Sequence, residues 1–306
     1  MRLAFTAALL ALALPAIAHG WTRPGHMVSA AIAYDELAAR NPEALKRLLA
    51  IAAQHPDRGP FEVAIGRATG AERDRLVFME LARWPDDVRG GPHDHPTWHY
   101  AMRPVTDPRD PPPHAPSSEA AGAAAEAFAL NLRVASDPNA PAADRAQALA
   151  WIFHLVGDIH QPLHTAQLFS RRFPDGDRGG SRQHVTDPVG GQPITLHWLW
   201  DDSVNRDGDG EAAFARAHEL TARLPRSAFP ELAAATRAAD FTAWGAESYA
   251  LAAPVVYRAD LRTGDTPGEA DAAAPAYLEV MTRTAETRLT LAGYRLADIA
   301  EAIAGR

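Results

Sequence analysis

The sequence predicts an all-α protein, a single-domain bundle of helices with room for one small β-hairpin. Along most of the chain, apolar residues recur every three or four positions, which is the period of an amphipathic helix, whereas the alternation typical of strands is scarce. Capping residues and prolines stand where several of these runs begin. With 306 residues, 47% of them hydrophobic, the chain can bury a full core.

Residues 1–20 have the pattern of a secretory signal peptide. A basic residue precedes an apolar run over residues 3–17, which is too short for a membrane span. Small residues stand third and first before a cut after Gly20, and we expect cleavage there, which leaves residues 21–306 as the mature domain. A rival cut after Ala18 stays open. No later segment is apolar enough to cross a bilayer, so we expect a secreted or periplasmic protein.

Three helices are expected in the first part of the mature chain. An amphipathic run follows His26 and continues to Leu37. Asn41, with a proline directly after it, predicts the capped start of a second helix. A third run over residues 76–84 is expected to end at Pro85, because proline cannot donate the next helical hydrogen bond.

The middle of the chain contains the helix with the most functional residues. The proline-rich residues 103–116 predict a loop, and the alanine-rich residues 119–134 predict a helix that stops before Pro138. A longer helix is expected over residues 141–160, ended by Pro162.

The last part of the chain returns to helices after one excursion. Glycines punctuate residues 173–192, where the small hairpin is expected. Residues 197–201 predict a short helix, and residues 246–251 and 276–304 predict helices that close the bundle. The tryptophans expected in the core are Trp98, Trp151, Trp198, Trp200 and Trp244.

Two pairs of metal-binding side chains stand four residues apart. His154 with Asp158, and His197 with Asp201, each share one face of an expected helix. One such pair would mean little, but two pairs indicate a site for several metal ions. Further candidate ligands in the sequence are His26, Asp86, His99 and His164.

The composition limits which metal the chain can bind, but it does not exclude an anionic substrate. Because the chain has no cysteine, a metal would be held by nitrogen and oxygen atoms, and imidazole with carboxylate suits Zn²⁺. A formal net charge of −8 is unusual for a protein that binds polyanions. Bound Zn²⁺ would place positive charge in the cleft where a phosphate would lie, so an anionic substrate is not excluded.

Residues 153–164, Phe-His-Leu-Val-Gly-Asp-Ile-His-Gln-Pro-Leu-His, resemble the signature of the P1/S1 nuclease family of trinuclear zinc nucleases, part of the phospholipase C/nuclease superfamily. Other landmarks of the family follow the same order: Trp21-x4-His26, Trp84-Pro85-Asp86, Trp98-His99-Tyr100, Leu196-His197-x3-Asp201 and Gly293-Tyr294-Arg295-Leu296-Ala297. The resemblance covers the whole mature chain and implies the helical bundle of that superfamily.

The resemblance implies three zinc sites. The ligands of the first ion would be Asp86, His99, His154 and Asp158. The ligands of the second would be His164, His197 and Asp201. The third would be held by the α-amine and carbonyl of Trp21, by His26 and by Asp158. Asp158 would therefore bridge the first and third ions, and Trp21 would have to be the mature N-terminus. Asp87 competes with Asp86, but Asp86 holds the family position.

The resemblance also implies a reaction. A metal-activated hydroxide would attack phosphorus in line, cleaving single-stranded RNA and DNA to products with 5′ phosphates, and 3′-nucleotides would be a further substrate. Besides Asp86 and Asp158, Arg89 would be catalytic, since it matches a family arginine that binds a phosphoryl oxygen. Tyr100 would stack on a base. Met102 replaces an aspartate that commonly reads the base edge, so we expect a weak or altered base preference in a monomeric enzyme.

Two other functions stay open. Zinc phospholipases C share the architecture and cleave phosphodiesters, although they have a longer tryptophan-to-histidine spacing and usually glutamate in place of Asp201. An exported zinc-binding protein would bind metal without turnover and would give no role to Arg89 or Tyr100. Taken alone, Arg89 could be a solvated charge at a helix end and His99 a hydrogen-bonded structural residue.

Overall fold

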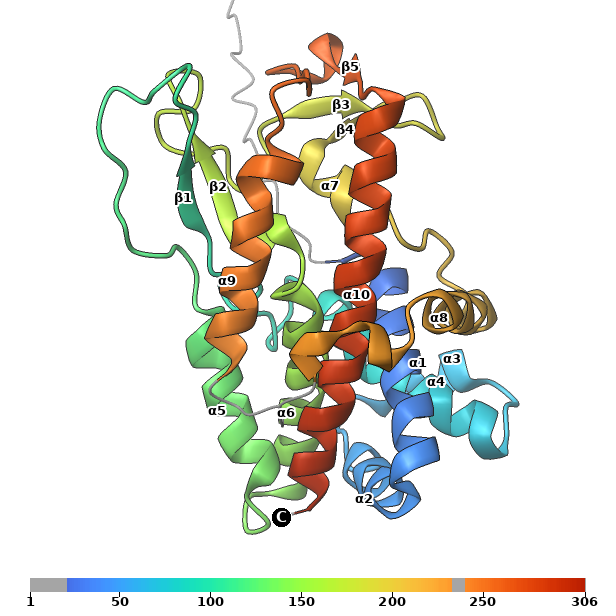
Figure 1. Cartoon of the computed structure of the whole chain (residues 1–306). Helices are drawn as coiled ribbons and strands as arrows, with labels where there is room; N and C mark the ends of the chain where they lie inside the picture. The colour runs from blue at the N-terminus through green and yellow to red at the C-terminus, as the bar shows by residue number, and fades with distance from the viewer. Residues whose placement is uncertain (1–20, 233–239, 306) are drawn as a thin grey trace, which may run out of the picture.

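The computed structural model describes residues 21–232 and 240–305, and these residues are mostly helical, as predicted. The helices form one bundle, and two small sheets lie towards the end that is uppermost in Figure 1. The predicted signal peptide, residues 1–20, lies outside the described residues. Among the helices of the described part, none is long and apolar enough to cross a membrane.

The first two helices meet at Asn41. Helix α1 (Arg23–Arg40) starts before His26, which therefore lies in its first turn. Helix α2 (Pro42–Ala52) begins with the predicted cap, since the side-chain oxygen of Asn41 accepts a hydrogen bond from the Ala44 N–H at 3.0 Å. A cap of this kind contributes about 1 kcal/mol to helix stability.

Helix α4 (Gly70–Asp87) is longer than predicted at both ends. It continues through Pro85, and the Val88 N–H donates to the Trp84 carbonyl at 3.1 Å, which closes the last turn. The prediction that the helix ends at Pro85 is wrong, because so close to the end a proline removes a single backbone bond. Asp86 therefore lies inside the last turn. The short helix α3 (Arg58–Ile65) precedes α4 and has no clear signal in the sequence.

The centre of the bundle is helix α10 (Pro275–Ala304), which runs along most of the molecule in Figure 1. Helices α1, α5 (Ala124–Ser136) and α6 (Ala142–Asp158) pack against it. A Cβ atom at Gly293 would lie 2.7 Å from the Cβ of Ile32, so α10 and α1 approach closely only because residue 293 has no side chain. Helices α5 and α6 agree with the predicted helices to within a few residues, apart from the later start of α5.

The strands form two small sheets. Strand β1 (Arg103–Thr106) pairs in parallel with β2 (Ala166–Phe169), although the sequence predicts a loop there. That prediction fails because a strand so short, with a proline in it, shows no measurable alternation. Strands β3 (His184–Thr186) and β4 (Pro193–Thr195) form a small antiparallel hairpin, as expected, although β4 begins just after the range 173–192 predicted for it. Strand β5 (Asp271–Ala272) pairs in parallel with β3.

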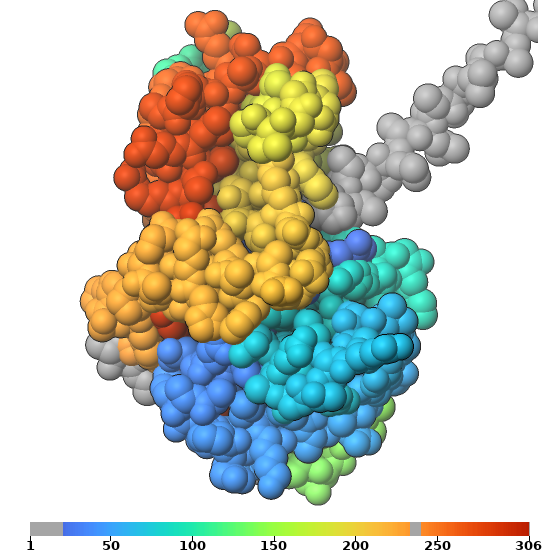
Figure 2. All heavy atoms as spheres, turned by 90° about the vertical axis from the view of Figure 1, so that its right-hand side faces the viewer, coloured from blue at the N-terminus to red at the C-terminus, as the bar shows by residue number. Residues whose placement is uncertain are grey.

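Shorter helices complete the fold: α7 (Leu196–Asp201), α8 (Gly210–Arg223), η2 (Arg226–Ala228), η3 (Pro230–Leu232), α9 (Phe241–Leu251), η5 (Ala252–Val256) and η6 (Pro267–Glu269). In Figure 2, α8 (gold) lies over α1 (blue) and beside α3 and α4 (cyan). Of the tryptophans expected in the core, Trp151, Trp200 and Trp244 are buried, Trp98 is half-buried against the core, and Trp198 on α7 is 39% exposed. The prediction for Trp198 is wrong, since a six-residue helix beside the surface keeps one face in solvent.

Candidate metal centre

Helix α6 supplies the first pair of candidate ligands. His154 and Asp158 stand one turn apart near its end, with Nε2 of His154 3.1 Å from Oδ2 of Asp158. Both side chains are buried. The predicted sharing of one helical face is therefore realised, and the segment that follows α6 bends away at Pro162 in a short 3₁₀ turn, η1 (Pro162–His164).

The end of α4 and the segment after it bring three more residues to His154. Nδ1 of His99 lies 2.9 Å from Nε2 of His154 and 3.1 Å from Oδ2 of Asp158. Oδ1 of Asp86 lies 3.8 Å from Nε2 of His154. Arg89 donates to this same oxygen from Nε at 2.9 Å and from Nη2 at 2.5 Å. Asp86, His99 and His154 thus form one group with ligand atoms within 4.8 Å of one another.

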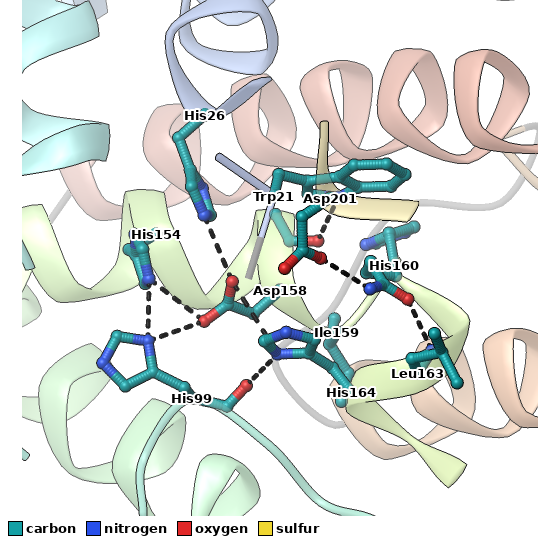
Figure 3. A network of polar contacts seen from close by, with 12 residues as sticks. Trp21, His26, His99, His154, Asp158, Ile159, His160, Leu163, His164 and Asp201 are labelled. Carbon is teal, nitrogen blue, oxygen red and sulfur yellow. Dashed lines mark hydrogen bonds and ion pairs between the residues drawn. The ribbon is translucent and has the colours of Figure 1, made fainter. Parts of the chain in front are cut away.

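The first turn of α1 approaches the other side of Asp158. Nε2 of His26 lies 3.2 Å from Oδ1 of Asp158, and a dashed line marks this contact in Figure 3. A Cβ atom at residue 157 would lie 2.7 Å from Nδ1 of His26, so the ring fits against α6 only because that residue is Gly157. His26, His154 and Asp158 form a second group within 4.8 Å. Trp21 is fully buried beside it, and its indole N–H donates to the Gly157 carbonyl at 3.0 Å.

The third group joins η1 to α7. Nε2 of His164 lies 3.2 Å from Nε2 of His197, which in turn lies 3.3 Å from Oδ2 of Asp201. These atoms also lie within 4.8 Å of one another. The side chain of Thr195 accepts from the Trp198 N–H at 3.0 Å and caps α7, so the helix that carries His197 and Asp201 starts with a defined turn.

Backbone carbonyls orient three of the imidazoles. The Nδ1–H of His154 donates to the Ala82 carbonyl at 2.9 Å. The Nδ1–H of His164 donates to the His99 carbonyl at 2.5 Å, and that of His197 to the Gly179 carbonyl at 2.6 Å. Each bond turns Nε2 towards the cluster, which is the arrangement typical of metal-binding histidines. Sequence patterns do not reveal these partners, because every residue has a carbonyl.

Burial and neighbouring charges shift the pKa values of the centre in different directions. Burial opposes a charge on His154, but Asp158 and Asp86 raise its pKa above the usual value, and burial raises the pKa of Asp201 well above the usual range. Burial lowers the pKa of His26, and it lowers the pKa of His99 to about 4, so both rings are neutral at pH 7. Burial opposes ionisation of Asp86, but His154 and Arg89 hold the pKa of its carboxyl below the usual range. In the same way, His154 and His164 outweigh the burial of Asp158 and hold its pKa well below the usual range.

Several buried polar atoms of the centre have no hydrogen-bond partner in the described part of the chain. They are Nδ1 and Nε2 of His26, Oδ2 of Asp86, Nε2 of His99, Oδ1 of Asp158 and Oδ2 of Asp201. An unpaired buried polar atom costs about 1–3 kcal/mol. Six such atoms on five residues of the centre indicate that something other than the protein satisfies them.

The predicted base-stacking residue lies beside the centre. Tyr100 follows His99 directly and is half-buried, and its carbonyl accepts from the Ala124 N–H at 3.2 Å. Met102, two residues later, is buried at 4% exposure. A Cβ at Gly179 would lie 2.8 Å from the Met102 methyl carbon, so Met102 packs against the segment whose carbonyl orients His197.

Known proteins resemble this chain over very different lengths. A model of the family described as S1/P1 Nuclease matches residues 21–305. Nuclease S1 of Aspergillus oryzae is 35% identical over 63 residues, which are 21% of this chain and 18% of that protein. The match therefore covers less than a fifth of the length of this curated relative. Because the family model spans nearly the whole chain, the protein belongs to the S1/P1 nuclease family.

Proposed function

We propose that this protein is a zinc-dependent endonuclease with three zinc ions, which hydrolyses single-stranded RNA and DNA to products with 5′ phosphates and also dephosphorylates 3′-nucleotides. The observation that carries the proposal is the position of Asp158. Its Oδ1 lies 3.2 Å from Nε2 of His26, and its Oδ2 lies 3.1 Å from Nδ1 of His99. A carboxylate that faces two groups of ligand atoms can bridge two ions, as in other hydrolytic sites with several metals.

The residues of the centre fit zinc. The three groups contain imidazole and carboxylate only, and the unpaired nitrogen and oxygen atoms indicate a ligand that accepts electron pairs from both elements. One ion would be held by Asp86, His99, His154 and Asp158, a second by His164, His197 and Asp201, and a third by Trp21, His26 and Asp158. Bound zinc would polarise the phosphate and promote ionisation of water at neutral pH.

Arg89 and Tyr100 have distinct proposed roles. The Arg89 side chain is 9% exposed, and its guanidinium is fixed on Asp86, 3.4 Å from Nδ1 of His99. A cation held there can bind a phosphoryl oxygen as negative charge develops on it. Tyr100 would stack on a base next to the cleaved bond, which favours single strands because a duplex hides base faces. The buried Met102 offers no carboxylate to a base, in keeping with a weak base preference.

A substrate panel tests this proposal. The mature protein is incubated with single-stranded RNA, single-stranded DNA, duplex DNA, a 3′-nucleotide and phosphatidylcholine vesicles, and the product ends are determined. We expect cleavage of both single-stranded substrates to 5′-phosphorylated products, phosphate release from the 3′-nucleotide, and slower cleavage of the duplex. Hydrolysis of phosphatidylcholine without cleavage of nucleic acid would replace the proposal with a phospholipase.

Export and processing belong to the proposal. Residues 1–20 would be a signal peptide removed after Gly20, so that residues 21–306 form a secreted or periplasmic monomer with Trp21 at its N-terminus. A free α-amine at Trp21 can bind zinc, whereas a peptide nitrogen there cannot. The mass of the exported protein decides the point, because a chain that starts at His19 would remove this ligand.

A further inference from the structure

We propose that Gln161 is a positioning residue that sets the carboxylate of Asp201 and the turn carrying His164 in one fixed arrangement. The inference rests on the proposed function, since it concerns the zinc ion that His164, His197 and Asp201 would hold. Gln161 is not one of the ligands suggested by spacing, and it lies in none of the three groups.

The nitrogen of the Gln161 side chain determines which oxygen of Asp201 faces the cluster. Gln161 is fully buried, and its Nε2 donates to Oδ1 of Asp201 at 2.7 Å. The other oxygen, Oδ2, then lies 3.3 Å from Nε2 of His197 and has no hydrogen-bond partner in the described residues. Without this bond the carboxylate could rotate about its terminal torsion, for which preferences are broad.

The oxygen of the same amide holds the turn that carries His164. Oε1 of Gln161 accepts from the Leu163 N–H at 2.5 Å and caps the turn Pro162–His164. Both contacts are drawn as dashed lines that end at Asp201 and Leu163 in Figure 3. Because the two ends of an amide group are rigidly connected, the positions of His164 and Asp201 are set relative to each other.

The residue next to Gln161 ties this segment to α10. Nδ1–H of His160 donates to the Val156 carbonyl at 2.7 Å, so its Nε2 is free to accept from Nη1 of Arg295 at 2.9 Å. Nε of Arg288 donates to the His160 carbonyl at 3.4 Å. Both arginines are buried, and Glu247 pairs with each of them, at 2.9 Å from Arg288 and 2.7 Å from Arg295. Gln161 therefore projects from a backbone that is fixed on two sides.

This arrangement makes a specific prediction about metal binding. Removing a residue that orients a metal ligand typically lowers the affinity for the metal by about 10- to 100-fold. Loss of a residue that supported only the fold would weaken the binding of all three ions equally, or would lower the stability of the protein without changing its affinity for zinc. Gln161 contacts the group of His164, His197 and Asp201 alone, so its loss should weaken the binding of one zinc ion of the three.

The test is zinc affinity in Gln161→Met, which has a similar length and no amide, and in Gln161→Asn, whose amide is too short to reach both partners. Bound zinc is measured by elemental analysis of the mature protein after equilibration with buffers of graded free Zn²⁺. The matched control is Gln192→Met, since the Gln192 amide also donates to a carboxylate, Oδ2 of Asp187 at 3.2 Å, outside the three groups.

We expect both Gln161 variants to bind one zinc about 10- to 100-fold more weakly and the other two as the wild type does. The control should keep wild-type affinity for all three. If Gln161→Met fails to fold, the zinc affinity of Gln161→Asn provides the test. Unchanged affinity, or an equal loss at all three sites, would overturn the inference while leaving the nuclease proposal intact. A wild type that binds zinc but cleaves no nucleic acid would refute the proposed function alone, and a wild type that binds no zinc would refute both.

Discussion

The imidazole rings of His26 and His154 stack face to face, with centroids 3.8 Å apart and planes inclined by 21°. This contact joins the first turn of α1 to the last turns of α6, and Asp158 lies one helical turn after His154. Two protonated rings would repel each other at this separation, whereas two neutral rings can each offer a nitrogen to an ion. The stack is therefore the point where the N-terminal segment of the chain completes the centre.

Replacement of Asp158 tests its bridging role. We expect Asp158→Asn to lower hydrolysis of single-stranded RNA by about 10³-fold or more, because in the proposed site the variant would lose a charged ligand of two ions at once. Elemental analysis should find fewer than three zinc ions per chain. Asp144→Asn, at an exposed position in the first turn of the same helix, is the control and should keep wild-type activity. Full zinc content and activity in Asp158→Asn would exclude the bridge.

Replacement of Arg89 separates binding of phosphate from support of Asp86. We expect Arg89→Met to lower kcat by about 10²- to 10³-fold with little change in zinc content, and Arg89→Lys to recover part of the loss. Arg133→Met, at an exposed position on α5, should have no effect. Since Arg89 donates twice to Oδ1 of Asp86, zinc is counted in every variant. A fall in kcat that only matches the zinc lost would show that Arg89 acts through Asp86.

Replacement of Tyr100 tests stacking on a base. We expect Tyr100→Ala to reduce kcat/KM on single-stranded DNA roughly tenfold or more, since a stacked base contributes about 1–3 kcal/mol. Tyr100→Phe keeps the ring and should stay near wild type. The loss should appear mainly in KM, because the contact is made to bound substrate before the reaction as well as during it. Equal KM values for Tyr100→Ala and the wild type would show that no base of the bound substrate stacks on Tyr100.

A buried carboxyl outside the centre makes stability depend on pH. Burial raises the pKa of Glu80 on α4 to about 7, against the opposing effect of Arg83. In the folded state the carboxyl therefore prefers to be protonated, and the stability it contributes is present below about pH 4.5 and is lost as pH rises to about 7. Over this range the effect is of the order of 3 kcal/mol.

Glu80→Gln removes this titration without changing shape. In urea unfolding with a chelator present, so that zinc release does not contribute, the variant should gain stability relative to wild type between pH 4.5 and 7. The gain should level off above pH 7, because the wild-type carboxyl is then charged in both states. A difference between the two proteins that does not vary with pH would mean that Glu80 ionises normally in the fold.

Much of the centre could be predicted from sequence because helices convert spacing into geometry. His154 with Asp158, and His197 with Asp201, are four residues apart, and each pair lies on one side of a real helix. The grouping of distant residues such as His26 and Asp158 came from the family resemblance, since no local pattern relates them. The cap at Asn41 was also predictable, because it joins residues only three positions apart, Asn41 and Ala44.

Other features could not be predicted because they depend on long-range packing. Strand β1 exists because β2 pairs with it, and its four residues have no strand pattern of their own. Helix α4 continues through Pro85 because the bond closed by Val88 and the burial of Trp84 stabilise the last turn. The role proposed for Gln161 depends on Asp201, forty positions later, and no feature of the motif reveals that contact.

The most direct test of the account is a zinc titration of the chelated mature protein, with hydrolysis of single-stranded RNA followed at each addition. The account predicts no turnover without metal, uptake of three zinc ions per chain, and full release of 5′-phosphorylated products once the three groups around Asp158, His26 and Asp201 are filled. Cleavage that persists in the chelator, or a protein that takes up three ions and cleaves nothing, would contradict it.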